Sequence, residues 1–205
     1  MTARSALRAL FRRIIGIYFR DVEVVGDVPT ASTSGRLLAA NHVNALVDPI
    51  LVLTSVPCDV SPLAKSTLWN IPGLRWLLDV ANAVPIVRRR DDPNKDASKN
   101  EAIFDRVATH LSGGGNVLIF PEGTSHNEPH LIALRTGAGR MLARAYEAGA
   151  RDLSFQAVAL EFDARHVFRS RALVLYGPVR KVAELEASGD ALVEAITLRM
   201  RDDLG

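Results

Sequence analysis

A histidine and an aspartate six positions apart are the first residues of this chain that could do chemistry together. His42 and Asp48 follow a short strand-like segment, residues 36–40. An imidazole titrates near neutrality and can take a proton from an alcohol, while a carboxylate holds the reactive tautomer and stabilises the imidazolium. No nucleophilic side chain belongs to this cluster, so the alcohol would be that of the substrate. The same residues are also compatible with a plain helix start, capped by Asn41 or Asn44, with His42 in solvent.

A second polar cluster directly follows another strand-like segment, residues 116–120. Gly123 lets the backbone approach a ligand closely, and the N–H groups after it, with the hydroxyls of Thr124 and Ser125, could hold a phosphate. Glu122 cannot bind an anion, so it would accept a hydrogen bond from a substrate hydroxyl or orient a nearby cation. An ordinary turn explains the same residue types, because Pro, Gly, Thr and Ser all favour turns.

Two basic residues could add to phosphate binding. Arg88 directly follows the strand-like segment 83–87, and its guanidinium could bind phosphate through two hydrogen bonds. Lys65 follows the segment 59–64 and could also reach a phosphate. Alternatively, Arg88 begins a self-compensated charge run, residues 88–92, and Lys65 is simply solvated.

The segments that must position these residues alternate between strands and helices. The expected strands are residues 36–40, 59–64, 83–87, 116–120, 154–162 and 171–176. The expected helices are residues 46–55, 96–111, 137–149 and 190–200, with a further helical stretch after Lys65 that breaks at Pro72. This alternation predicts an α/β fold, a single domain over residues 1–205 with a mixed, mostly parallel sheet flanked by helices. Such folds bind ligands at strand ends, where these clusters lie.

Residues 3–20 predict a basic amphipathic helix ahead of the sheet. Its apolar positions recur at helical spacing, at Leu7, Leu10, Phe11, Ile14, Ile15 and Tyr18. Arg8, Arg12 and Arg13 lie off that stripe, so the helix could dock on an anionic membrane. It could also pack on the protein's own core, and both could hold if the arginines face lipid while part of the stripe is buried. The longest uncharged run, residues 14–19, is too short to span a bilayer, which predicts a soluble or peripheral protein.

The composition excludes several other classes of protein. Of 205 residues, 25 are basic and 23 acidic, and a net charge of +2 does not suggest a nucleic-acid binder. The single cysteine, Cys58, excludes an intrachain disulfide and a cysteine-based zinc site, and it fits a reducing compartment. His126 and His130 are four apart, but Pro129 lies between them and no third ligand is evident, so we expect no metal site. The glycines at 113–115 precede a strand, unlike those of a nucleotide-binding loop.

Three segments together resemble the first motif blocks of the glycerol-phosphate and lysophospholipid acyltransferase superfamily. They are Asn41-His42 with Asp48-Pro49, then Val84-Pro85-Ile86-Val87-Arg88, then Phe120-Pro121-Glu122-Gly123-Thr124-Ser125. Residues 134–137 and 156–160 occupy the places of later family segments, and the similarity extends from about residue 19 to residue 177. Ser125-His126 and residues 168–172 look closest to the branch that acylates glycerol 3-phosphate or dihydroxyacetone phosphate.

The resemblance implies acyl transfer from acyl-CoA or acyl carrier protein to a hydroxyl of glycerol 3-phosphate or 1-acylglycerol 3-phosphate. It implies that His42 is the general base, that Asp48 orients it, and that Arg88 and the Glu122–Gly123 turn bind the acceptor phosphate. No cofactor is expected, because the thioester is already activated. The enzyme would work as a peripheral protein on the cytoplasmic face of a membrane.

Two departures from the family pattern stand out. Five residues separate His42 from Asp48, whereas four is the common family spacing, so the pair requires a bulged turn. This spacing keeps open an alternative, a non-catalytic lipid- or membrane-binding protein on the same scaffold. In the fourth family segment, Ala157-Val158 stands in place of the usual Pro-Val, a change that would affect specificity rather than chemistry.

Overall fold

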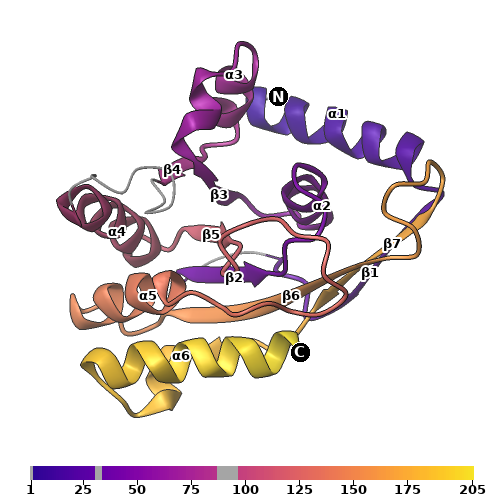
Figure 1. Cartoon of the computed structure of the whole chain (residues 1–205). Helices are drawn as coiled ribbons and strands as arrows, with labels where there is room; N and C mark the ends of the chain where they lie inside the picture. The colour runs from indigo at the N-terminus through magenta and orange to yellow at the C-terminus, as the bar shows by residue number, and fades with distance from the viewer. Residues whose placement is uncertain (1, 31–33, 87–96) are drawn as a thin grey trace.

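The computed structural model describes residues 2–30, 34–86 and 97–205, with side chains from residue 101 onward in the last range. Within these residues eight strands form one sheet (Figure 1). The strands are β1 (Asp21–Gly26), β2 (Arg36–Ala40), β3 (Val60–Lys65), β4 (Val84–Ile86), β5 (Asn116–Ile119), β6 (Ser154–Phe162), β7 (Arg171–Tyr176) and β8 (Arg180–Lys181). Their order is β1-β7-β6-β2-β5-β3-β4, and β8 pairs with β6.

The pairing confirms the expected α/β fold with a mixed, mostly parallel sheet. Each neighbouring pair in the series β6-β2-β5-β3-β4 is parallel, and β1 is parallel to β7. The antiparallel pairs in the described part of the chain are β6–β7 and β6–β8. The helices are α1 (Ala3–Tyr18), α2 (Val47–Ser55), α3 (Leu74–Val80), α4 (Ala97–Ser112), α5 (Gly137–Glu147) and α6 (Gly189–Leu204), with short 3-10 turns η1 (Ser66–Asn70) and η2 (Val182–Leu185).

The central strand β2 shows why both faces of the sheet are apolar. Leu37 and Ala39 join a core formed with α4, α5 and α6, whereas Leu38 and Ala40 join a second core formed with α1 and α2. Figure 1 shows these two groups of helices on opposite sides of the sheet. A strand covered on both faces reads as a continuous apolar run, which made β2 recognisable in the sequence.

Strand β1 is the main element that the sequence pattern did not predict. It lies at one edge of the sheet, and four of its six positions, Asp21, Glu23, Val24 and Gly26, are exposed. An edge strand of this kind lacks both the apolar run of a central strand and a clean alternation, so no signal marks it.

Helix α1 forms as predicted, but two of its arginines, Arg8 and Arg12, are turned toward the protein. Arg8 donates hydrogen bonds to the carbonyls of Pro57 and Cys58, both at 2.8 Å, and Arg12 donates to the carbonyl of Thr54 at 2.9 Å. These carbonyls lie at and just beyond the C-terminus of α2, where backbone acceptors lack helical partners and attract cations. The expectation that the arginines face lipid is therefore wrong for Arg8 and Arg12, whereas Arg13 is exposed.

The outward side of α1 is largely apolar. Leu10, Ile14 and Ile17 are 53%, 46% and 58% exposed, whereas Leu7 and Ile15 are buried. The apolar stripe is thus split between the core and the surface. Among the described residues, no helix has the length and apolarity needed to cross a membrane.

Candidate active site

His42 and Asp48 meet in the loop between β2 and α2. The Nδ1 atom of His42 lies 2.9 Å from Oδ2 of Asp48, a residue with no exposed surface in the first turn of α2. The five intervening residues form the bulged turn that the spacing requires. Ala45 adopts a left-handed conformation with φ of +38°, and the N–H of Val47 donates to the carbonyl of Asn44. The N–H of Asn44 also donates to Asp48 Oδ2, at 2.7 Å, which orients the carboxylate.

The hydrogen bond to Asp48 determines which nitrogen of His42 is available for chemistry. An ionised carboxylate only accepts, so Nδ1 carries the proton and Nε2 keeps its lone pair. Nε2 has no hydrogen-bond partner among the described residues. The ring stacks on Phe120 at 4.1 Å between centroids, and the side chain is 12% exposed. The arrangement leaves one imidazole nitrogen that could accept a proton.

Asn41 does not cap the helix, and neither does Asn44. The N-cap residue of α2 is Leu46, without a capping side chain. Instead, the side chain of Asn41 extends the β2–β6 pairing. Its Nδ2 donates to the carbonyl of Leu160 at 3.0 Å, and its Oδ1 accepts from the N–H of the same residue at 2.7 Å. The interpretation of this cluster as a capped helix start is therefore wrong.

Glu122 is buried and uses both carboxylate oxygens within the protein. Oε1 accepts the backbone N–H of His42 at 2.7 Å. Oε2 contacts Nε2 of His126 and accepts the N–H of Ile132 at 3.3 Å. Of the two roles expected for this carboxylate, contact with a neighbouring basic side chain matches the geometry.

The turn after Glu122 brings an arginine against its backbone. Gly123 has φ of +75°, and a Cβ atom at this position would lie 2.9 Å from Nε of Arg135. The N–H of Arg135 donates to the carbonyl of Pro121 at 2.8 Å. The guanidinium is exposed and forms no ion pair in the described part of the chain. Thr124, the next residue of this turn, is half-buried.

Two contacts from distant segments hold the two polar clusters together. Arg165, in the β6–β7 loop, donates to the carbonyls of Val43 and Asn127, both at 3.1 Å. The hydroxyl of Ser125 accepts the N–H of Ala45 at 3.1 Å. Sequence reasoning noted Arg135 only as part of the family segment 134–137, and it missed Arg165, which stands in no recognisable spacing relative to the histidine.

The predicted phosphate-binding residue Lys65 lies at the same edge of the sheet. It ends β3, which pairs in parallel with β5. Lys65 therefore lies at the same carboxyl ends of the strands as His42 and Glu122. Lys65 pairs in register with Ile86, the last residue of β4. Arg88 lies outside the described residues.

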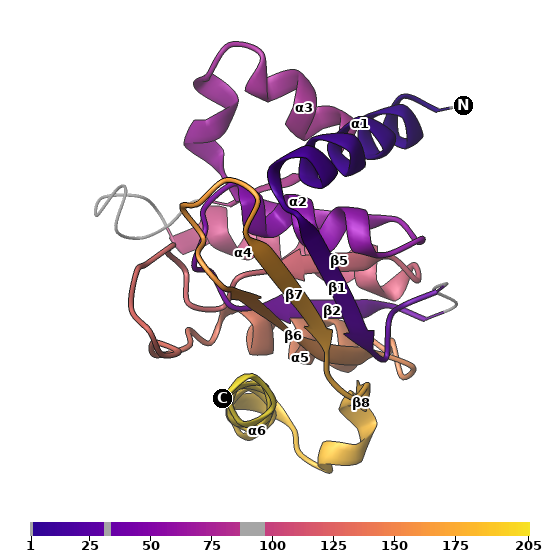
Figure 2. The same ribbon diagram turned by 90° about the vertical axis from the view of Figure 1, so that its right-hand side faces the viewer.

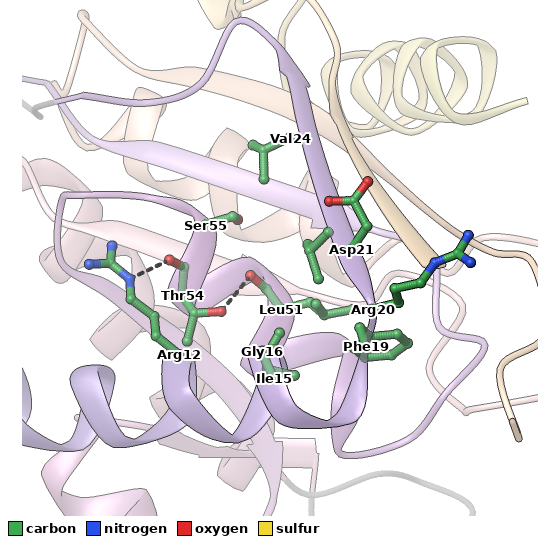
Figure 3. Close-up of a pocket in the computed structure, with 11 residues that line it drawn as sticks. Arg12, Ile15, Gly16, Phe19, Arg20, Asp21, Val24, Leu51, Thr54 and Ser55 are labelled. Atoms are coloured by element: carbon green, nitrogen blue, oxygen red, sulfur yellow. Dashed lines mark hydrogen bonds between the residues drawn. The ribbon is translucent and has the colours of Figure 1, made fainter. Parts of the chain in front are cut away.

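A separate groove of about 320 Å³ lies between α1, α2 and the start of β1 (Figure 3). Its apolar lining includes Ile15, Phe19 and Leu51, and Arg12 and Thr54 form part of its polar rim. The groove borders the last turn of α2, whereas Asp48 belongs to the first turn. Helix α2 therefore carries both Asp48 and part of the lining of the groove.

Comparison with known proteins places these observations in a family. A family model described as Acyltransferase matches residues 21–161. The lyso-ornithine lipid O-acyltransferase of Pseudomonas aeruginosa is 34% identical over 142 residues, covering 69% of this chain and 48% of that protein. The lysophosphatidylcholine acyltransferase of Drosophila melanogaster is 35% identical over 120 residues, covering 58% of this chain and 21% of that protein. The chain thus spans about half or less of the length of these relatives.

A solved structure has the same fold. The crystal structure of the 1-acyl-sn-glycerophosphate (LPA) acyltransferase PlsC from Thermotoga maritima matches with a TM-score of 0.65. The match covers 98% of this chain and 79% of that one, at 17% sequence identity.

Proposed function

The chain belongs to the acyltransferase family that this model describes, and from that premise we propose that it acylates a hydroxyl of a glycerolipid precursor. The donor is a fatty acyl thioester, acyl-CoA or acyl carrier protein, and the acceptor is glycerol 3-phosphate or 1-acylglycerol 3-phosphate. The observation that carries the proposal is the His42–Asp48 pair, with Nδ1 held at 2.9 Å and Nε2 without a partner in the described structure.

The proposed reaction is a direct transfer. Nε2 of His42 takes the proton of the acceptor hydroxyl while the oxygen attacks the thioester carbonyl. The C–O bond forms, the C–S bond breaks, and the departing thiolate takes the proton back from the imidazolium. Asp48 stabilises that imidazolium through Nδ1–H. The thioester supplies the activation, so the step requires no additional cofactor.

The headgroup of the acceptor would bind at the carboxyl ends of β5 and β3. Thr124 and Ser125 offer backbone N–H groups, whereas that of Gly123 donates to the carbonyl of Phe120 at 3.0 Å. Arg135 lies directly across this turn. Lys65 ends the neighbouring strand, and Arg88 follows β4 in the sequence. We assign the phosphate to these cations and N–H groups. We assign Glu122 to the support of His42, since Oε1 accepts the N–H of His42 and Oε2 is engaged by His126.

The acyl chain of the donor would lie in the groove under α1. The groove has an apolar lining of Ile15, Phe19 and Leu51. It also lies between α2 and the helix that we propose to rest on the membrane. A chain in this groove would run from the lipid surface along α2 toward His42.

Membrane docking would use an outer apolar surface formed by α1 and the β6–β7 loop. Its members are all exposed, and they are Leu10, Ile14, Ile17, Val167 and Phe168. The loop lies beside the end of α1 (Figure 2). There the N–H of Arg169 donates to the carbonyl of Tyr18 at 2.7 Å. The same loop carries Arg165, which contacts the His42 loop. Insertion of this surface on the cytoplasmic face, with the outward Arg13 near anionic headgroups, would bring the site to its lipid substrate or product.

The geometry supports an enzyme over a non-catalytic lipid-binding protein. The reason for that alternative was the five-residue spacing between His42 and Asp48. The left-handed Ala45 accommodates the extra residue, and the two side chains form a normal hydrogen bond.

Acyl transfer by the purified protein tests the proposal. Labelled palmitoyl-CoA or palmitoyl carrier protein is supplied with vesicles and, in parallel, with glycerol 3-phosphate or 1-acylglycerol 3-phosphate. Lyso-ornithine lipid and lysophosphatidylcholine are added as further acceptors, because two matched relatives bear those names. We expect acyl product from a phosphate-bearing acceptor. Product from the other acceptors alone would overturn the acceptor assignment, and lipid binding without product from any acceptor would support the non-catalytic alternative.

A further inference from the structure

The backbone of His42 is held on both sides by the turn that begins at Glu122. The N–H of His42 donates to Glu122 Oε1 at 2.7 Å, and its carbonyl accepts the N–H of His126 at 3.1 Å. The residue that bears the base is therefore anchored by a segment 80 positions later in the sequence. These contacts restrain the backbone, whereas Asp48 restrains the ring.

The side chain of His126 completes this anchor. Its Nε2 faces Oε2 of Glu122, and its Nδ1 accepts the N–H of Glu128 at 3.2 Å. A backbone N–H can only donate, so Nδ1 keeps its lone pair and Nε2 carries the proton that points at the carboxylate. Both ring nitrogens are thus engaged within the protein. This leaves His126 no free polar atom for a substrate.

Glu122 depends on His126 for its geometry. The carboxylate is 1% exposed, and its partners in the described structure are two backbone N–H groups and the imidazole. Without the imidazole, Oε2 retains the N–H of Ile132 at 3.3 Å, which is a long contact. A buried acceptor that loses its main donor is costly, so the carboxylate would reorient or admit water. Either change loosens the bond to the N–H of His42.

We propose that His126 is a positioning residue, which keeps Nε2 of His42 in place for proton transfer by holding Glu122. This inference rests on the proposed function, in which His42 is the base. The inference distinguishes His126 from His130, the exposed histidine four positions later, which has no hydrogen bond or ion pair within the described residues. Displacement of a catalytic group by about 1 Å can lower a rate by about 10²-fold.

Two pairs of variants test the proposal kinetically. His126→Ala should lower kcat by about 10²-fold while the KM for the acceptor changes less than about threefold, since no substrate contact is lost. His126→Gln should restore most of the rate, because its amide N–H can take the place of Nε2–H. His126→Asn keeps an amide but is too short to reach Glu122, and it should behave like the alanine variant. His130→Ala is the matched control and should retain the wild-type rate.

A spectroscopic readout keeps this test separate from the choice of substrate. The Nδ1–H of His42, bonded to Asp48, should give a downfield proton NMR signal, identified by its disappearance in Asp48→Asn. We expect this signal to weaken in His126→Ala and His126→Asn and to return in His126→Gln. An unchanged signal together with unchanged kcat in His126→Asn would overturn the proposal, as would a rise in acceptor KM at constant kcat. If the alanine variant does not fold, the Asn and Gln pair decides.

Discussion

In the loop that carries His42 and in helix α1, a basic side chain points toward the protein. What remains for a ligand differs between the two regions: a polar nitrogen atom in the loop and an apolar surface on α1. In the loop, His42 is hydrogen-bonded to Asp48, and its Nε2 atom has no partner in the described structure. In α1, Arg8 finds the carbonyls beyond α2, and the side of the helix that remains accessible is apolar. In the first region the Nε2 atom could take part in chemistry, and in the second region the apolar side of the helix could contact lipid. The identity of a residue thus indicates what it can do, while its partner decides which way it points.

This comparison predicts that the two regions respond to different substitutions. Changes around His42 should alter the rate of acyl transfer. Changes on the outer side of α1 should alter membrane binding, and changes on its inner side should alter stability.

Among substitutions that leave His42 itself in place, the largest effect is expected at Asp48. Asp48→Asn keeps the size of the side chain but replaces the charged acceptor, so Nδ1–H is no longer fixed and the imidazolium is no longer stabilised. We expect kcat to fall by about 10³-fold, measured as acyl product formed at saturating donor. Vesicle binding, which depends on α1, should remain at the wild-type level. Parallel losses of rate and binding would contradict the separation of the two regions.

The next largest effect is expected on the outer side of α1. Replacement of Leu10, Ile14 and Ile17 by serine removes three exposed apolar side chains, each of which stabilises binding by about 1.5 kcal/mol if it is buried in lipid. We expect the vesicle partition coefficient to fall by at least about 10²-fold in a sedimentation assay. The unfolding free energy should change little, because these side chains are exposed in the folded protein. A wild-type partition coefficient would show that membrane docking does not use this side.

A smaller effect, on stability alone, is expected on the inner side of α1. Arg8 donates to two carbonyls and to Asp59, and its side chain is 18% exposed. Arg8→Met should lower the free energy of unfolding by about 2 kcal/mol in urea titrations, because the bonded carbonyls lose a charged donor. Arg13→Met is the matched control, since Arg13 is exposed and makes no contact with the described protein. Equal losses in both variants would remove the distinction between the two sides.

These contrasts also show how far the sequence alone could lead. The strands β2 and β5 and the polar residues after them were predicted, because buried strands read as apolar runs and their ends carry chemically capable residues. The same pattern does not show that Glu122 supports His42, since that contact joins residues 80 positions apart. In α1 the helical spacing of the apolar residues predicted a helix. An arginine with its long aliphatic stem can nevertheless point inward when backbone carbonyls there accept its hydrogen bonds. The face that points inward is decided by packing on α2, which no local pattern records.

The smallest effect is a pH dependence of stability at the last turn of α2, the helix between the His42 loop and α1. Ser55, in the last turn, shares a hydrogen bond of 2.7 Å with the hydroxyl of Tyr176, and burial raises the pKa of Tyr176 well above its usual value. Above about pH 10 the unfolded chain releases this proton while the folded chain retains it, so the unfolding free energy falls as the pH rises.

Tyr176→Phe tests this dependence directly. Between pH 8 and pH 11 the wild-type protein should lose about 1 kcal/mol more stability than the variant, measured by urea unfolding. Ser55 keeps its bond to the carbonyl of Val52 in the variant, so the comparison is not disturbed by an orphaned hydroxyl. Parallel stability curves for the two proteins would show that Tyr176 is ionised as readily in the fold as outside it.

The measurement that tests the central claim most directly is the rate of acyl transfer by His42→Ala beside that of His130→Ala, each compared with wild type. Both substitutions remove one imidazole, but only His42 is hydrogen-bonded to a buried carboxylate and has its Nε2 free of partners in the described structure. With circular dichroism confirming that both variants fold, we predict that His42→Ala lowers kcat by about 10²- to 10⁴-fold, while His130→Ala stays at the wild-type rate. A His42→Ala variant that transfers acyl groups within about threefold of wild type would contradict the account.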